Sequence, residues 1–461
     1  MNGKKRRFEN FALYDYQGVE AHLSRMAAKG WRLEKVGISL WTYRQAEPAE
    51  VRYAVTYSHN VSQFDPVPTE EQEVLEDLCE AAGWKFVCDW NQMQIFATED
   101  PDPVPLETDE ALRLEVIHKT MKKHYFPANI LLLVLALFIV ASNINTIIRT
   151  PLLFFGSNSK MFSALMFLLV VLLTVHQLGS YYLWRRRSEK SIAAGGNCVP
   201  LRSNYRKFSL ISLIFVTFCA IGYAVLEAVT RQVGYAVFYI VYLALLFLLI
   251  TLVQGTKKLL KRRGVSKGKN MSITLAVDFI LAFALMGGLM YAAFRFDWFD
   301  GGKQQDSYIY QKESWDTDPA SIPLTITDIT GEEFDHIRRS DYSHGSILLS
   351  IHEYRERVLR ESDGVRQNLS YGIQEPHTQW LYDAVLEDRL SSRSIDGFSR
   401  MYTWQEEDPT IWGADFVYQQ YEKNVSRHIW LLCWPGRIVT LNPDGALSPE
   451  EMSRIGQKLR P

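Results

Sequence analysis

The chain has 461 residues, of which 47% are hydrophobic and 22% are charged, and this length accommodates two or three domains. The 50 Lys and Arg residues and 52 Asp and Glu residues give a formal net charge of −2, which argues against a chain that binds nucleic acid through a general positive charge. The five cysteines form no CxxC pair and have no metal-ligand spacing, so we expect neither a metal nor another cofactor.

Residues 1–110 are predicted to form an α+β domain built from a repeated unit. AAKGWRLEK at 27–35 and EAAGWKFVC at 80–88 share one pattern. A shift of 53 residues aligns Gly30 with Gly83 and Trp31 with Trp84. Each Gly is suited to end a helix in the left-handed conformation. Each Trp then opens a strand, which a second strand follows.

The helix of each copy has a start signal. Asp15 can cap the first helix, and Thr69 with Gln72 forms a capping box for the second. With a strand before each helix, the domain is predicted to be a tandem strand-helix-strand-strand repeat. We expect both units to share one antiparallel sheet with the helices on one face. Each Trp would seal the core between helix and sheet, with ligand binding by the Trp pair as the alternative.

The stretch FALYDYQGVEAHLSRMAAKGWRLEKV, followed by VRYAVTY at 51–57, resembles the N-terminal domain of a family of uncharacterised bacterial membrane proteins. The resemblance covers about residues 8–130, and its signature is a helix ending in AxxGW followed by alternating strands. It implies a cytosolic domain of unknown function followed by membrane spans, encoded in many cases beside PadR-like transcriptional regulators. It implies no catalytic residues.

A basic juxtamembrane segment, 111–126, precedes a block that holds nearly all the long apolar runs. A bilayer core requires about 20 apolar residues in a helix. Five segments meet this requirement, and we predict that they form an α-helical five-span bundle between two α+β domains: 127–148, 161–183, 208–229, 233–253 and 272–294.

The positive-inside rule gives these spans an orientation. The connections 184–207 and 254–271 carry seven Lys and Arg residues each, whereas 149–160 carries two and 230–232 carries one. The two basic connections are therefore predicted to face the cytoplasm of a multi-pass protein in the cell membrane. The N-terminus is then cytoplasmic and the C-terminus extracytoplasmic. The basic connections are expected to lie on anionic membrane lipid, and their alternative roles are nucleic-acid binding or lipid sensing.

Ionisable groups inside spans are functional candidates, although hydration near the interface is the simpler explanation. His176 and Asp278 lie at similar depths from the cytoplasmic side and can pair, whereas Glu227 is near the outer end of its span, where it can reach water. The fifth span carries small residues at a spacing of four: Ala284, Gly288 and Ala292. This stripe suits close packing against another span or against a second copy of the chain.

Residues 295–320 are predicted to be a polar linker and 321–461 an extracytoplasmic α+β domain. SIPLTITDI reads as a strand, HTQWLYDAVLEDRL as an amphipathic helix, and LSPEEMSRIGQKL as a helix capped by Ser448. HEYRE at 352–356 lacks the second His of a zinc-protease helix, so we interpret it as the face of a strand.

The sequence favours one of three classes of function. A folded domain on each side of the spans favours a transmembrane sensor or signalling adaptor that has a cytosolic or membrane protein as its partner. The alternative is an accessory or core subunit of a transporter, with His176 and Asp278 as a polar relay, although the spans lack broken helices. A membrane enzyme is the third class, and no catalytic constellation in the sequence supports it.

Overall fold

The computed structural model describes residues 3–461 except 38–39, 59–61, 63, 67–68, 91, 202–203, 231–232, 297, 299–305 and 392–401. It divides into two compact units, which we describe separately. The first comprises Met1–Phe138, Met166–Ala224 and Val237–Phe296, and the second comprises Ile139–Leu165, Val225–Ala236 and Asp297–Pro461.

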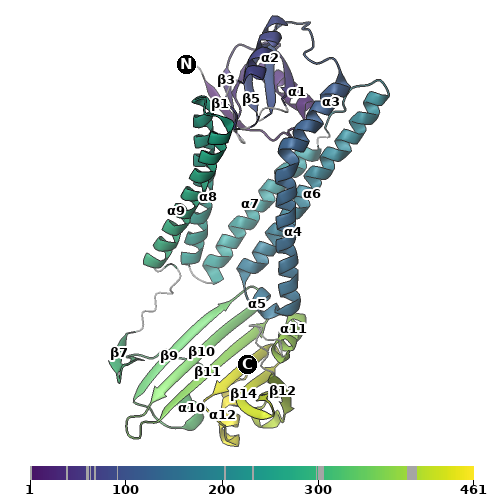
Figure 1. Ribbon diagram of the computed structural model, residues 1–461. Helices are drawn as coiled ribbons and strands as arrows, with labels where there is room; N and C mark the ends of the chain where they lie inside the picture. The colour runs from purple at the N-terminus through teal and green to yellow at the C-terminus, as the bar shows by residue number, and fades with distance from the viewer. Residues whose placement is uncertain are drawn as a thin grey trace. The chain divides into compact units, whose positions relative to one another are not determined.

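The N-terminal domain consists of the two predicted repeat units (Figure 1). The first contains β1 (Lys4–Phe8), α1 (Tyr16–Ala27), β2 (Trp31–Lys35) and β3 (Leu40–Gln45). The second contains β4 (Arg52–Tyr57), α2 (Glu70–Ala81), β5 (Lys85–Trp90) and β6 (Met93–Thr98). The strand orders β1-β3-β2 and β4-β6-β5 are equivalent and antiparallel. The repeat is thus present in both sequence and topology.

The prediction of one shared sheet is wrong, because the units form two three-stranded sheets. The pairing of β2 is irregular between Leu33 and Lys35, and that of β5 is irregular between Phe86 and Cys88. These irregularities fall at equivalent positions of the repeat and on edge strands. A bulge twists an edge strand away from regular pairing, which explains why the two edges do not join into one ladder.

Both sheets nevertheless contribute to one hydrophobic core. Leu23 of α1, Trp41 of β3 and Ile95 of β6 are almost completely buried in the same cluster. The rings of Trp41 and Trp90 lie 5.4 Å apart across the two units. The repeat therefore folds as a single domain, in which the second unit supplies apolar surface that the first unit needs.

The local signals in the repeat are confirmed. The Asp15 side chain accepts a hydrogen bond from the Gly18 N–H, and Thr69 and Gln72 form a complete capping box. Gly30 and Gly83 have φ angles of +74° and +83°. These angles lie in the left-handed region that glycine adopts without a steric cost.

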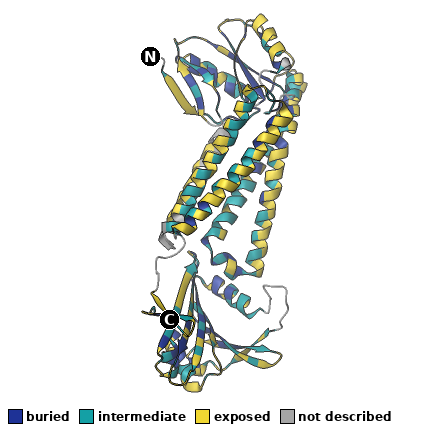
Figure 2. Ribbon diagram, turned by 60° about the vertical axis from the view of Figure 1, so that its left-hand side comes forward, coloured by how far each residue is buried: buried dark blue, intermediate teal, exposed yellow. Residues whose placement is uncertain are grey.

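Five long apolar helices in the described residues are compatible with a multi-pass membrane protein. The first is continuous through α3 (Glu110–Thr120), the π-helical turn η1 (Met121–Tyr125) and α4 (Phe126–Arg149); the others are α6 (Asn158–Ala193), α7 (Asn204–Thr230), α8 (Val233–Arg262) and α9 (Lys267–Arg295). Exposed residues run along these helices (Figure 2), and large apolar side chains are among them. Such surface is suited to contact with lipid.

The C-terminal domain is α+β, as predicted. Its seven-stranded antiparallel sheet has the order β12-β13-β14-β15-β11-β10-β9. The strands are β9 (His336–Gly345), β10 (Leu349–Leu359), β11 (Arg366–Pro376), β12 (Tyr402–Glu407), β13 (Phe416–Glu422), β14 (Val425–Trp434) and β15 (Arg437–Pro443). HEYRE lies within β10, as expected.

Short helices cover the sheet. The cluster that includes Leu369, Trp430 and Leu441 on one face is closed by residues of α10 (Ile326–Thr330), the 3₁₀ turn η2 (Thr410–Trp412) and α12 (Pro449–Leu459). On the opposite face, α11 (Gln379–Leu390) and α5 (Pro151–Phe155) pack on one part of the sheet only. The Ser448 cap of α12 is confirmed as a capping box with Glu451.

Two sequence interpretations of this domain are corrected. The segment expected to be a linker contains a hairpin, β7 (Ser307–Tyr310) and β8 (Glu313–Asp316). SIPLTITDI was expected to be a strand, but helix α10 (Ile326–Thr330) begins within it, because Thr325 and Asp328 make a capping box. A helix of one turn is too short for its apolar residues to show helical periodicity.

Candidate functional site

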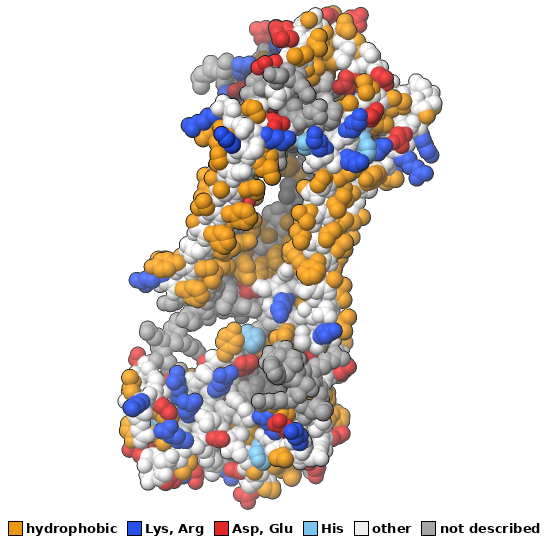
Figure 3. Space-filling view, viewed as in Figure 1, with side chains coloured by type: hydrophobic (Ala, Val, Ile, Leu, Met, Phe, Trp, Pro, Cys, Tyr) orange, Lys and Arg blue, Asp and Glu red, His pale blue; other side chains and the backbone are white. Residues whose placement is uncertain are grey.

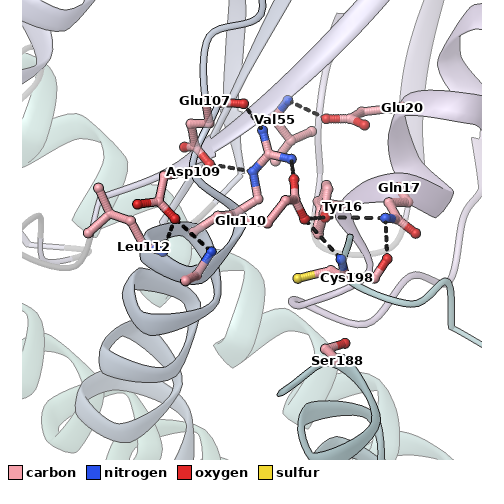
Figure 4. A network of polar contacts seen from close by, with 12 residues as sticks. Tyr16, Gln17, Glu20, Val55, Glu107, Asp109, Glu110, Leu112, Ser188 and Cys198 are labelled. Atoms are coloured by element: carbon pink, nitrogen blue, oxygen red, sulfur yellow. Dashed lines mark hydrogen bonds and ion pairs between the residues drawn. The ribbon is translucent and has the colours of Figure 1, made fainter. Parts of the chain in front are cut away.

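A polar network joins the repeat domain to the ends of the long helices within the first unit (Figure 4). We call it the junction and define it by Tyr16, Gln17 and Glu20 of α1, by Glu107, Glu110 and Arg113 at the start of α3, and by Cys198 after α6. The Asp109 side chain caps α3, accepting hydrogen bonds from the N–H groups of Ala111 and Leu112 at 2.9 and 3.0 Å. This cap fixes where the helix starts and therefore where Glu110 and Arg113 point.

Glu110 is the centre of the junction. One carboxylate oxygen accepts hydrogen bonds from the Cys198 N–H at 3.0 Å and the Tyr16 hydroxyl at 3.2 Å. The other oxygen pairs with Arg113 at 2.6 Å. Gln17 donates to the Cys198 carbonyl at 2.9 Å, so both backbone groups of Cys198 are held by side chains. The connection after α6 is thereby fixed to α1 and α3 together.

Arg113 neutralises the acidic groups of the junction. Its guanidinium pairs with Glu107 and Glu110 and lies 4.9 Å from the centre of the Tyr16 ring. The side chain is 15% exposed, so these interactions are only partly screened by water. Burial raises the pKa of the Cys198 thiol to about 11, so this thiol is protonated at neutral pH and is a poor nucleophile.

Glu20 connects the junction to β4. It accepts a hydrogen bond from the Val55 N–H at 2.9 Å. Burial raises the pKa of Glu20 to about 7, against smaller opposing effects of the Val55 N–H and the Arg113 charge. The carboxyl group therefore titrates near neutral pH.

The raised pKa of Glu20 predicts a pH-dependent stability. The unfolded pKa is about 4.3, so the folded protein binds more protons between about pH 4.3 and 7. Glu20 therefore does not lower the free energy of unfolding below the unfolded pKa. Part of that free energy is lost as the pH rises through the folded pKa of about 7 and the buried carboxyl group ionises. We expect Glu20→Gln to stabilise the protein by on the order of 2 kcal/mol at pH 8 and to change little at pH 4.

Thermal unfolding of the full chain in detergent at the two pH values measures this effect. Glu50→Gln is the matched control, because Glu50 is exposed and should have no effect at either pH. A Glu20→Gln variant that is equally stabilised at pH 4 and pH 8 would contradict the raised pKa.

An aromatic cluster supports the junction from the side of α6. The Tyr14 ring lies 5.1 Å from that of Tyr181 and 5.0 Å from that of Trp184. Arg185 donates to His118 Nε2 at 2.7 Å, and His118 Nδ1 lies 2.9 Å from the Tyr181 hydroxyl. Because a guanidinium has only donors, Nε2 accepts and Nδ1 carries the proton. Helices α3 and α6 are thus linked directly to each other and to the segment before α1.

A second contact ties the repeat domain to the start of α9. Asn270 is fully buried and donates to the Phe64 carbonyl at 2.9 Å, while Thr274 donates to the Asn270 side-chain oxygen at 3.1 Å. Lys267 lies 4.0 Å from Asp65. Both basic connections of the helices therefore approach the same domain, one through Cys198 and the other through Asn270.

The two tryptophans predicted to seal the core of the repeat, Trp31 and Trp84, lie outside the junction. Trp84 is 4% exposed and donates from Nε1 to the Val104 carbonyl at 2.8 Å. Trp31 is only partly buried, with the Lys5 ammonium 5.2 Å from its ring centre. Packing explains Trp84 well, whereas Trp31 packs less completely than the sequence suggested.

The ionisable groups predicted inside the spans are distributed over three helices. His176 of α6 lies 3.5 Å from the Ser180 hydroxyl, and its ring lies 4.0 Å from that of Phe208 in a tilted arrangement. Asp278 is partly buried on α9, and its pairing with His176 stays a prediction. Glu227 of α7 is completely buried, so the expectation that it reaches water is wrong in this structure.

Among the described residues, the stripe of small residues on α9 is mostly exposed. Ala284 and Gly288 are exposed and Ala292 is intermediate, whereas the neighbouring Leu289 and Ala293 are buried. A Cβ atom added to Gly288 would have no atom within 4 Å. The face of α9 that packs in this chain is therefore adjacent to the predicted one.

The sequence interpretation missed the junction residues Glu110, Arg113 and Cys198. Their contacts join segments 88 residues apart, and only the acidic cap at Asp109 gave a local signal. In the described part of the chain, no group of three or more His, Cys, Asp or Glu side chains is arranged to hold a metal ion.

Comparison with known proteins identifies one region of similarity. Residues 15–128 match the model of a family described as a protein of unknown function (DUF2812). This match covers most of the repeat domain, α3 and the start of α4. No curated protein and no solved structure matches the chain.

Proposed function

We propose that this chain is a multi-pass protein of the bacterial cell membrane that acts as a signalling adaptor. In this proposal the C-terminal domain is extracytoplasmic and detects a ligand. The repeat domain is cytosolic and contacts a protein partner. The orientation rests on the two connections rich in Lys and Arg and on the odd number of long apolar helices.

The observation that carries the proposal is the fixation of α6 at both of its ends. Near its start, the Asn158 side-chain oxygen accepts a hydrogen bond from the Ile347 N–H at 3.1 Å, in the turn between β9 and β10. Just before it, the Phe155 carbonyl accepts from the Ser346 hydroxyl, and the Phe155 ring lies 5.2 Å from that of Trp380. At its far end, Trp184 donates to the Val199 carbonyl at 2.8 Å, next to Cys198 of the junction.

A helix held by polar contacts at both ends is suited to transmit a displacement. The intrahelical hydrogen bonds make α6 stiff along its axis, and the groups at each end have specific partners that a shift would break. If ligand binding moved the β9–β10 turn, the junction would be strained or released. Such coupling requires two arrangements of the junction that differ in energy by a few kcal/mol.

Hydrogen exchange of the full chain in lipid nanodiscs tests the proposal. Asn158→Ala removes the contact at the start of α6, and we expect faster exchange both at Ile347 and at the Cys198 amide. Thr403→Ala, an exposed residue of β12 at the opposite edge of the sheet from β9, is the matched control and should leave Cys198 unchanged. Faster exchange at Ile347 without any change at Cys198 would contradict the adaptor function.

A further inference from the structure

One face of the C-terminal sheet has two different halves. In the first half, Leu349, Ile351 and Ile438 pack against Leu381 and Val385 of α11. In the second half, the same face of β10 continues as Glu353, Arg355 and Arg357, which are all exposed. The apolar cover therefore ends where the charged residues begin.

The second half forms a cavity of about 660 Å³, which we call the basic groove. It is lined by side chains from β9, β10, β11 and β15, among them Arg338, Ser340, Arg355, Arg357, Ser370 and Asn442. Lys and Arg side chains gather over the region of β9 and β10 in the space-filling view (Figure 3). The volume is within the usual range for small-molecule sites, about 300–1,000 Å³.

The three arginines are adjacent by the register of the sheet. Arg357 is directly opposite Arg338, and Arg355 is opposite Ser340 on one side and Ser370 on the other. Like charges at directly opposed positions repel each other. This arrangement is therefore unfavourable unless carboxylates or a bound anion compensate it.

The two carboxylates among the residues that line the groove, Glu356 and Asp444, each have a partner in the chain. Glu356 lies on the opposite face of β10, where it pairs with Arg339 at 2.8 Å and accepts from the Ile326 N–H. Asp444 accepts from the Asn368 N–H and amide, both at 3.2 Å. Of the groove arginines, Arg357 lies 3.8 Å from Glu313.

Arg355 is the group with free binding capacity. Within the described residues its guanidinium has no hydrogen-bond or ion-pair partner, and the residue is one of those that line the groove. On either side, Ser340 and Ser370 offer hydroxyl groups, and the Asn442 amide lies 3.4 Å from the Ser370 hydroxyl. A guanidinium presents a planar fork of donors that matches a carboxylate or a phosphate.

We propose that the basic groove binds an anionic saccharide, a ligand that carries a phosphate or carboxylate group together with several hydroxyl groups. The anion would sit between Arg355 and the Arg338–Arg357 pair. The sugar hydroxyls would exchange hydrogen bonds with the serine hydroxyls and the Asn442 amide, which both donate and accept. This proposal gives the class of ligand for the proposed sensor. It rests on the proposed function only for the side of the membrane from which the ligand reaches the groove.

Isothermal titration calorimetry of the full chain in detergent tests the proposal with three probes: glucose 6-phosphate, inorganic phosphate and glucose. We expect glucose 6-phosphate to bind at least about tenfold more tightly than either of the others, because only it offers both kinds of group. Glucose binding as tightly as glucose 6-phosphate would overturn the anionic part of the proposal. Equal affinity for inorganic phosphate would overturn the saccharide part.

Variants locate the site. Arg355→Ala should weaken binding of glucose 6-phosphate by about tenfold or more, and Arg355→Lys by less, because it keeps the charge but loses the fork. Arg427→Ala is the matched control, since Arg427 is an exposed arginine of β14 outside the groove. Absence of binding to the wild-type chain, or equal losses in Arg355→Ala and Arg427→Ala, would overturn the proposal. These outcomes do not depend on membrane orientation.

Discussion

Arg113→Ala is expected to destabilise the first unit by about 3 kcal/mol, as is typical when one partner of a buried ion pair is removed. The side chain is 15% exposed and neutralises Glu107 and Glu110. Without it, Glu107 and Glu110 lose their shared cation while both still act electrostatically on Glu20. Arg113→Lys should be less harmful, because a lysine keeps the charge while losing the paired donors.

Thermal unfolding of the full chain in detergent, followed by tryptophan fluorescence, measures this loss. The matched control is Arg25→Ala, which removes an arginine from α1 whose guanidinium, among the described residues, donates to the Ala21 carbonyl alone, at 3.1 Å. We expect the control to stay within about 0.5 kcal/mol of wild type. Equal effects of the two substitutions would show that the junction does not stabilise the domain.

Trp84→Ala is expected to cost about 3–4 kcal/mol, as truncation of a buried aromatic residue does. Trp84 packs with Cys79 and Phe96 in a small cluster, and its Nε1 hydrogen bond to Val104 holds the segment that leads to α3. The loss therefore combines a cavity with an unsatisfied carbonyl group.

The repeat supplies the control for this prediction. Trp31 occupies the equivalent position but is only partly buried, beneath Lys5. We expect Trp31→Ala to cost about 1 kcal/mol, since much of its surface is already in water. The same unfolding measurement compares the two variants, and an equal or larger loss for Trp31→Ala would contradict the difference in packing between the two units.

Features set by neighbouring residues were predictable from the sequence. The caps at Asp15, Thr69 and Ser448 are confirmed because a cap depends on side chains within three positions of the backbone groups that it binds. The left-handed glycines, Gly30 and Gly83, follow from the same local logic. Long apolar helices were equally clear, since composition alone identifies them.

Features set by contacts between distant segments were not predictable. The separation of the repeat into two sheets depends on bulges at Leu33–Lys35 and Phe86–Cys88. No residue pattern in the sequence predicts these bulges. The junction requires Glu110 to meet Cys198, 88 residues away. The basic groove depends on strand register, because Arg338 and Arg357 become neighbours only when β9 pairs with β10.

A measurement of the membrane orientation of the two domains tests the signalling-adaptor proposal most directly. Single cysteines at Glu47 and Ser362, both exposed, are introduced into a cysteine-free background, and intact cells are labelled with a membrane-impermeant maleimide. We expect that only position 362 reacts in intact cells and that position 47 reacts after the cells are opened. Labelling of neither position until the cells are opened would place both domains in the cytosol and contradict the signalling adaptor.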